Sequence, residues 1–148
     1  MTKTENAVNY FKNGFNCSQA VFASTAQDLG ISEDDCLRIG AAFGGGMARR
    51  QMTCGAVTGA LMAIGLKYGR AFNDDPGKKA ETYEKTLEFF SGFKKRNGSV
   101  NCRELLQGLD MNDPEDQKKI EELKLFQTSC SKYVKDAAEI VEAIIENK

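Results

Sequence analysis

Apolar positions along the chain recur at helical rather than strand spacing. Between residues 129 and 146 they fall three or four apart, at Ala137, Ile140, Val141, Ile144 and Ile145. A second apolar stripe, in the stretch 77–95, consists of Tyr83, Leu87, Phe89, Phe90 and Phe93. No hairpin dipeptide separates alternating apolar runs, and β-branched clusters are rare. The pattern therefore predicts an all-α fold, a single domain over residues 1–148 with about six to eight helices.

Capping residues and glycines set the expected helix boundaries. In the first half of the chain we expect helices at 5–12 after Thr4, at 17–29 between Asn16 and Gly30, from Ser32 to the triple glycine 44–46, and at 54–68 after Thr53. In the second half we expect helices at 77–95 after Asp75-Pro76, at 102–107 after Asn101, from Pro114 after Asp113, and at about 129–146. Several of these helices start at a cysteine.

The charge and length of the chain exclude some classes of partner. A formal net charge of −1 gives no electrostatic reason to expect nucleic acid or an anionic membrane as a partner. The longest apolar run, Ala60 to Leu66, is too short to span a bilayer, so we expect no membrane insertion. The first fifteen residues lack the apolar core of a signal peptide, and we expect a cytoplasmic protein.

The sequence holds five cysteines and no histidine, which narrows the chemistry to sulfur. Without histidine, the chain has no Cys-His zinc site, no Cys-His nucleophile pair and no histidine base. In a reducing compartment, cysteines at this density point to metal binding or redox activity rather than to structural disulfides.

Four of the cysteines share a local context that favours their thiolates. Cys17, Cys54, Cys102 and Cys130 follow Asn16, Thr53, Asn101 and Ser129, which are all residue types that cap helices. A thiol in the first turn of a helix ionises more readily because the backbone N–H groups and the helix dipole stabilise negative charge. Cys36 lies in the body of its predicted helix, and we expect it to be a core residue.

If these four helix starts converge, they form a sulfur site. The first hypothesis, which we favour slightly, is a metal or iron–sulfur cluster site for electron transfer, with all four cysteines as ligands. The second is a thiol–disulfide redox protein in which the same four are the reactive groups. The third is a structural or interaction protein whose cysteines only pack. No CxxC occurs, which excludes thioredoxin-type, zinc-ribbon and ferredoxin-type motifs as sequence patterns.

The glycine-rich stretch Gly44, Gly45, Gly46 does not match a nucleotide-binding loop. Arg49 interrupts the GxGxxG pattern and no Gly-Lys pair closes a Walker motif, so we expect no nucleotide. We favour an inter-helix turn; the alternative is that these glycines, with Gly55, let the backbone contact the sulfur site, where Arg49 and Arg50 would offset negative charge. For the face around Phe89 and Phe93 we favour core packing, and leave a homodimer interface open.

The string Cys54-Gly55-Ala56-Val57-Thr58-Gly59, together with Cys17, Cys102 and Cys130, resembles the C_GCAxxG_C_C family. The likeness extends over nearly the whole chain, including residues 16–21 and 43–47. The resemblance implies four signature cysteines, a redox role and an unidentified redox partner protein. A related module looks like part of the split-Soret cytochromes, where it is associated with an iron–sulfur centre. This chain has no CxxCH motif, so we expect no c-type haem.

Overall fold

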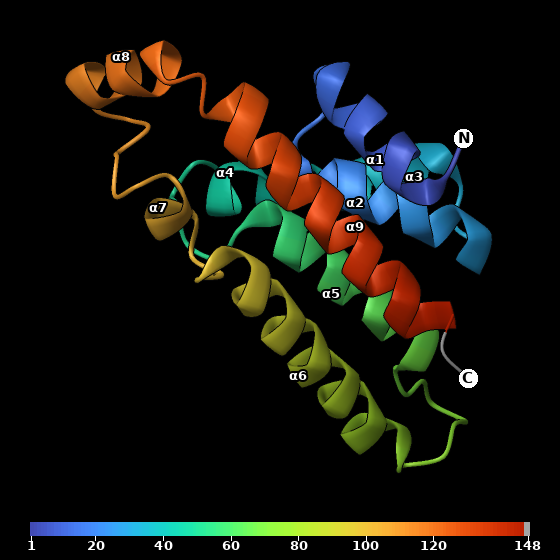
Figure 1. The fold of residues 1–148 in the computed structure, drawn as a ribbon. Helices are drawn as coiled ribbons and strands as arrows, with labels where there is room; N and C mark the ends of the chain where they lie inside the picture. Colours follow the sequence, from blue (N-terminus) through green and yellow to red (C-terminus); the bar gives the residue numbers. More distant parts are fainter. Residues whose placement is uncertain (147–148) are drawn as a thin grey trace.

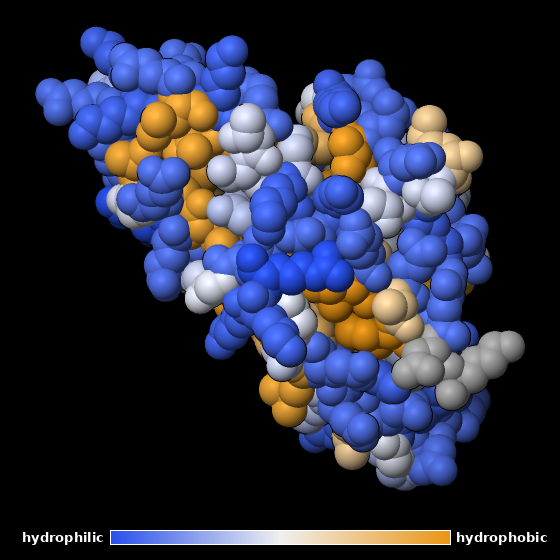
Figure 2. Space-filling view, in the orientation of Figure 1, coloured by the Kyte–Doolittle hydropathy of each residue, from blue (hydrophilic) through white to orange (hydrophobic). Residues whose placement is uncertain are grey.

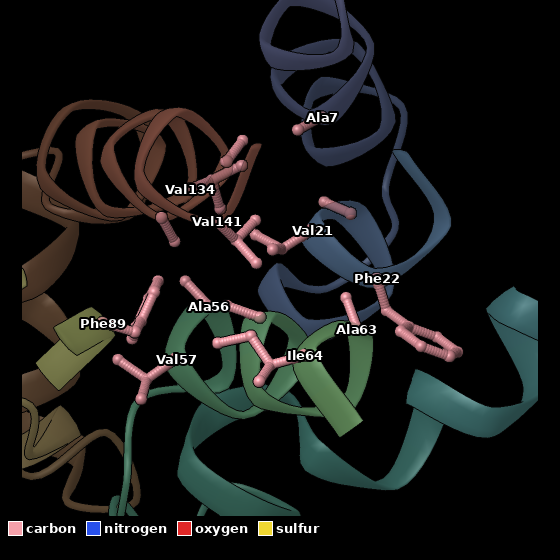
Figure 3. Packing of buried hydrophobic residues seen from close by; sticks show 14 of the residues in the cluster. Ala7, Val21, Phe22, Ala56, Val57, Ala63, Ile64, Phe89, Val134 and Val141 are labelled. Atoms are coloured by element: carbon pink, nitrogen blue, oxygen red, sulfur yellow. The ribbon is translucent and has the colours of Figure 1, made fainter. Parts of the chain in front are cut away.

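Helix α5 (Gly55–Tyr68) lies at the centre of the structure, a computed structural model that describes residues 1–146 (Figure 1). Three helices pack on it: α2 (Cys17–Ala26), α6 (Lys78–Asn97) and α9 (Ser131–Glu146). Small and apolar residues occupy most sides of α5, so other helices can pack against it on several sides. In Figure 3 the side chains of its Val57 and Ile64 lie among those of the neighbouring helices.

The remaining helices cover the sides of this core. Helix α1 (Lys3–Lys12) packs against α2 and α9, and α3 (Glu33–Gly40) packs against α2. Short 3₁₀ turns, Gln27–Leu29 and Ala41–Phe43, extend α2 and α3. None of the helices among residues 1–146 is long and apolar enough to cross a membrane.

Helices α7 (Cys102–Leu105) and α8 (Pro114–Glu122) stand apart at one end of the molecule (Figure 1). This end has its own small apolar cluster, formed by Leu106, Met111, Ile120 and Leu125. Figure 2 shows apolar residues gathered at the same end. The segment 102–125, which we call the α7–α8 lobe, is thus held by an apolar cluster separate from the main core.

The predicted fold class is confirmed, as are four of the eight predicted helix caps. Within residues 1–146 there is no strand, and seven helices have eight residues or more, apart from the four-residue α4 (Gly44–Met47) and α7. The predicted caps that accept a backbone N–H of the first turn are Asn16, Ser32, Asn101 and Asp113.

In the helices that carry no cysteine, the predicted caps Thr4 and Asp75 were wrong. Helix α1 begins at Lys3 rather than Glu5, because Thr2 and Glu5 form a reciprocal capping box, so Thr4 is inside the helix. Helix α6 begins at Lys78, within one residue of the predicted start, but Asp75 does not cap it; its side chain accepts from the Gly77 N–H in the preceding turn.

The apolar stripe on α6 is narrower than predicted. Phe89 and Phe93 are fully buried, stack on each other and belong to the core, which confirms the favoured interpretation. Tyr83 and Leu87, however, are 60% and 66% exposed. At about 100° per residue, the midpoint of Tyr83 and Leu87 lies roughly 120° around the helix from that of Phe89 and Phe93, so the two pairs face different surroundings.

Candidate functional site

The four signature cysteines line one cavity of about 440 Å³, although they come from distant parts of the sequence. Cys17 begins α2, Cys54 precedes α5, Cys102 begins α7, and Cys130 lies in the turn before α9. Cys36 does not line this cavity; it is fully buried in the core, as its position in the body of a helix predicted. The cavity therefore lies where the main helical core meets the α7–α8 lobe.

Cys17 occupies the predicted position, the first residue of a capped helix. The Asn16 side chain accepts a hydrogen bond from the Gln19 N–H at 2.9 Å, and the Gln19 side chain accepts one from the Asn16 N–H. The pKa of Cys17 falls to about 7, chiefly because the Cys54 thiol donates a hydrogen bond to its sulfur. Burial opposes this shift, and the backbone N–H groups of Gly45 and Ser18 add to it.

Cys54 is itself the N-cap of α5, so the prediction that Thr53 caps this helix was wrong. The reason is a contact that is distant in sequence. The Cys54 N–H donates to the Val100 carbonyl at 2.8 Å, and the Cys102 N–H donates to the Met52 carbonyl at 2.7 Å. Thr53 is thereby held in a bridge opposite Asn101, which also brings Cys54 and Cys102 to the same end of the cavity.

The Cys17–Cys54 pair divides its charge unequally. The pKa of Cys54 is raised well above its ordinary value by its hydrogen bond to Cys17, by burial and by the charge on Cys17. The N–H groups of Ala56 and Val57 in the first turn of α5 oppose this rise. Above about pH 7 the pair therefore holds one negative charge, which favours Cys17, with Cys54 as the protonated partner.

Cys102 begins α7 as predicted, but Cys130 does not begin a helix. The chain from Phe126 to Cys130 forms a π turn that leads directly into α9, and the Cys130 N–H donates to the Leu125 carbonyl at 3.0 Å. Ser129 therefore caps nothing. Burial raises the pKa of both Cys102 and Cys130 to about 12, with a further contribution from the charge on Cys17.

The glycines singled out from the sequence lie against the cysteines or their caps. A Cβ atom on Gly55 would overlap Sγ of Cys17, and one on Gly46 would lie 2.8 Å from Cβ of Cys102. Gly44 likewise leaves room for the Asn16 side chain. These contacts account for the glycines through close approach of the sulfur-bearing elements.

The segment from Gly45 to Arg49, which includes most of the short element α4, forms a left-handed turn. Gly45, Gly46, Met47, Ala48 and Arg49 have φ values between 52° and 70°. Such a run costs energy at the three residues that are not glycine, and it directs the Gly45 N–H at Cys17. Of the two arginines expected to offset charge, Arg49 lines the cavity and Arg50 is exposed outside it.

Gln51 was not identified from the sequence; its hydrogen bonds connect this turn to the α7–α8 lobe. Its side chain is buried, donates to the Leu109 carbonyl at 2.8 Å and accepts from the Met111 N–H at 2.8 Å. Arg49 adds a 3.1 Å bond to the Met111 carbonyl. No local pattern marks Gln51, because both of its partners lie about sixty residues away.

Comparisons with known proteins place this chain in a family. A family model described as "Putative redox-active protein (C_GCAxxG_C_C)" matches residues 15–144, a range that includes all five cysteines. A protein of Archaeoglobus fulgidus, described as "Uncharacterized protein", is 29% identical over 115 residues, which cover 73% of this chain and 76% of that one. No solved structure matches this chain.

Proposed function

The chain belongs to the C_GCAxxG_C_C family, and we propose that it is a redox protein in which Cys17 and Cys54 form a reactive dithiol. One observation carries the proposal: the Cys17 and Cys54 thiols are hydrogen-bonded to each other and line the same cavity. The lowered pKa of Cys17 favours its thiolate, with Cys54 as the neighbouring thiol. A thiolate is the nucleophile of thiol–disulfide exchange, and a neighbouring thiol is needed to complete it.

The exchange balances with a disulfide RSSR as the oxidant. The Cys17 thiolate attacks one sulfur, the S–S bond breaks, and one half leaves as RS⁻ while the other stays on Cys17 as a mixed disulfide. Cys54 then gives its proton to solvent and attacks Sγ of Cys17, which releases the second RS⁻ and forms a Cys17–Cys54 disulfide. Two electrons pass from the protein to RSSR. The second step is eased because Cys17 no longer carries the charge that raised the pKa of Cys54.

Titration of the fully reduced protein with 4,4′-dithiodipyridine tests this function. We expect two thiopyridones per disulfide consumed, and a Cys17–Cys54 disulfide by peptide mapping. C54S should stop at the mixed disulfide on Cys17 with one thiopyridone released. C36S, which alters the buried cysteine outside the cavity, should behave as the parent. Oxidation that leaves Cys17 and Cys54 unlinked would overturn the proposal.

A second candidate function uses all four cysteines. Cys102 and Cys130 line the same cavity, and a dithiol reaction gives them no role. Four thiols are the donor set that iron–sulfur clusters take, and a cluster held by these four would supply one-electron transfer. Among residues 1–146, no group of three or more Cys, Asp or Glu side chains is arranged to hold a metal ion, so this second candidate rests on the shared cavity alone.

Anaerobic purification separates the two candidates. Stoichiometric iron and sulfide with visible absorption in the parent and in C36S, lost in C102S and C130S, would favour the cluster. Protein free of iron and sulfide after anaerobic reconstitution, with a reversible Cys17–Cys54 disulfide, would favour the dithiol.

A further inference from the structure

The sulfur atoms of the proposed dithiol are recessed. Cys54 is only 6% exposed, and Cys17 is half-buried below the surface of the same cavity. A disulfide on the surface of a folded protein cannot bring its sulfur atom to the in-line position that thiolate attack requires without entering the cavity. A small molecule can, because a volume of about 440 Å³ lies within the range of small-molecule sites, roughly 300–1,000 Å³.

The walls of the cavity are apolar. The larger side chains that line it are Phe11, Leu105, Leu106, Met111, Phe126 and Tyr133. The hydroxyl of Tyr133 is already used, since it donates to the Leu105 carbonyl at 2.7 Å. These walls favour a ligand with an aromatic or aliphatic body and offer few hydrogen bonds to a strongly polar one.

Arg49 is the one charged side chain among the described residues that line the cavity. Its Nη2 donates to the Met111 carbonyl at 3.1 Å, which holds the guanidinium beside the opening. Cβ and Cγ of Arg49 lie beside Gly45, and, against the effect of burial, the charge of the guanidinium lowers the pKa of Cys102, which lines the same cavity, so the cation acts on the sulfur site. Glu121 shares a smaller neighbouring pocket with Arg49, but no ion pair forms between them.

We propose that the cavity binds a low-molecular-weight organic disulfide with an apolar body and a carboxylate. The body packs against the walls, the carboxylate accepts from the free N–H groups of Arg49, and one sulfur reaches Sγ of Cys17. This inference rests on the proposed dithiol function and names the substrate class for it. The atoms and electrons balance as in the exchange already written, with RSSR as this disulfide.

The test compares two aromatic disulfides that differ in charge. 5,5′-Dithiobis(2-nitrobenzoate) carries carboxylates, and 4,4′-dithiodipyridine is neutral. Stopped-flow rates with the reduced full chain are divided by the rates of the same compounds with N-acetylcysteine, which removes their intrinsic reactivity. We expect R49Q to lower the carboxylate-to-neutral rate ratio about tenfold, the effect of losing one charge-assisted hydrogen bond. R50Q, the exposed neighbour outside the cavity, should change the ratio less than twofold.

The outcomes are distinguishable from failure of the proposed function. If C17S reacts as fast as the parent with both compounds, the dithiol function is overturned. If Cys17 is the fast thiol but R49Q leaves the ratio unchanged, or R50Q lowers it equally, the carboxylate site is overturned. Reduction of the insulin disulfides as fast as of the small compounds would overturn the small-molecule assignment; insulin reduction at least tenfold slower supports it.

Discussion

The Sγ atom of Cys17 fills the space beside Gly55 that a Cβ atom would occupy. Gly55 is the first residue of α5 and follows Cys54 directly, so this contact sets how closely the start of α2 can approach the start of α5. The short distance between Cys17 and Cys54 therefore depends on glycine having no side chain at position 55.

Gly55→Ala should separate the two thiols and destabilise the fold. The added methyl must displace Cys17 Sγ, and overpacking of this kind costs about 1–3 kcal/mol. Gly65→Ala is the matched control in the same helix, because nothing lies within 4 Å of a Cβ there, and it should stabilise by about 0.5–1 kcal/mol. Urea unfolding gives both values. Equal effects of the two variants would contradict the close-packing argument.

Removal of the Cys54 thiol should raise the pKa of Cys17. The largest cause of its value of about 7 is the hydrogen bond from Cys54, and C54A removes that donor while C54S keeps one. Alkylation of Cys17 by iodoacetamide, followed against pH by mass spectrometry, should have its midpoint near pH 7 in the parent. The midpoint should move toward pH 9 in C54A and less in C54S. The same midpoint in all three would show that Cys54 does not stabilise the thiolate.

Cys102 and Cys130 should stay protonated and slow to alkylate at pH values where Cys17 reacts, because burial raises their pKa values to about 12. In the unfolded chain these thiols ionise near pH 9. Above pH 9 the unfolded state therefore binds fewer protons than the folded state, and the free energy of unfolding falls as pH rises. Cys17 acts in the opposite sense between about pH 7 and 9, since its pKa is lowered on folding.

The double variant C102S/C130S isolates this alkaline effect. It should make the fall in unfolding free energy above pH 9 less steep, with the remainder due to Cys54 and Cys36, whose pKa values are also raised, and it should leave the Cys17 contribution below pH 9 in place. A parent whose stability is constant between pH 9 and 11 would contradict the raised pKa values.

Local chemistry explains what could be predicted from the sequence. Asn16 and Asn101 were identified as caps because their partners lie three residues away, and the period of apolar residues gave the core face of α9. Thr53 was misassigned because the groups that fix it, around Val100 and Asn101, are nearly fifty residues distant.

Two other features of the site could not be predicted, because they also depend on contacts between residues far apart in the sequence. The residues near Cys130 fit both a helix that starts at Ser129 and a helical stretch that already includes Phe126, and the local sequence does not decide between them. The common cavity of the four cysteines likewise depends on how the α7–α8 lobe meets the main core, which no local pattern encodes.

Asn16 and Thr53 should differ in their importance, although both precede a signature cysteine. Asn16→Ala removes the acceptor for the Gln19 N–H and the 3.0 Å bond to the Ala41 carbonyl, and should cost about 1–2 kcal/mol. Thr53→Ala should cost no more than about 0.5 kcal/mol, because its side chain caps nothing. Chemical denaturation of both variants checks the difference. A larger loss in T53A would restore Thr53 as the cap of α5.

Gln51 should influence Cys17 without touching it. Gln51→Ala leaves the Leu109 carbonyl and the Met111 N–H without their partner, which should cost about 1–3 kcal/mol. The left-handed turn should also loosen, so that the Gly45 N–H stabilises the Cys17 thiolate less and the alkylation midpoint of Cys17 rises. Gln51→Gly relieves the positive φ of 55° at this position but still removes both bonds, and should show the same direction. Exposed Gln127→Ala is the control and should change neither quantity. If Q51A lowers stability but leaves the Cys17 midpoint unchanged, Gln51 supports the fold alone and does not position the turn.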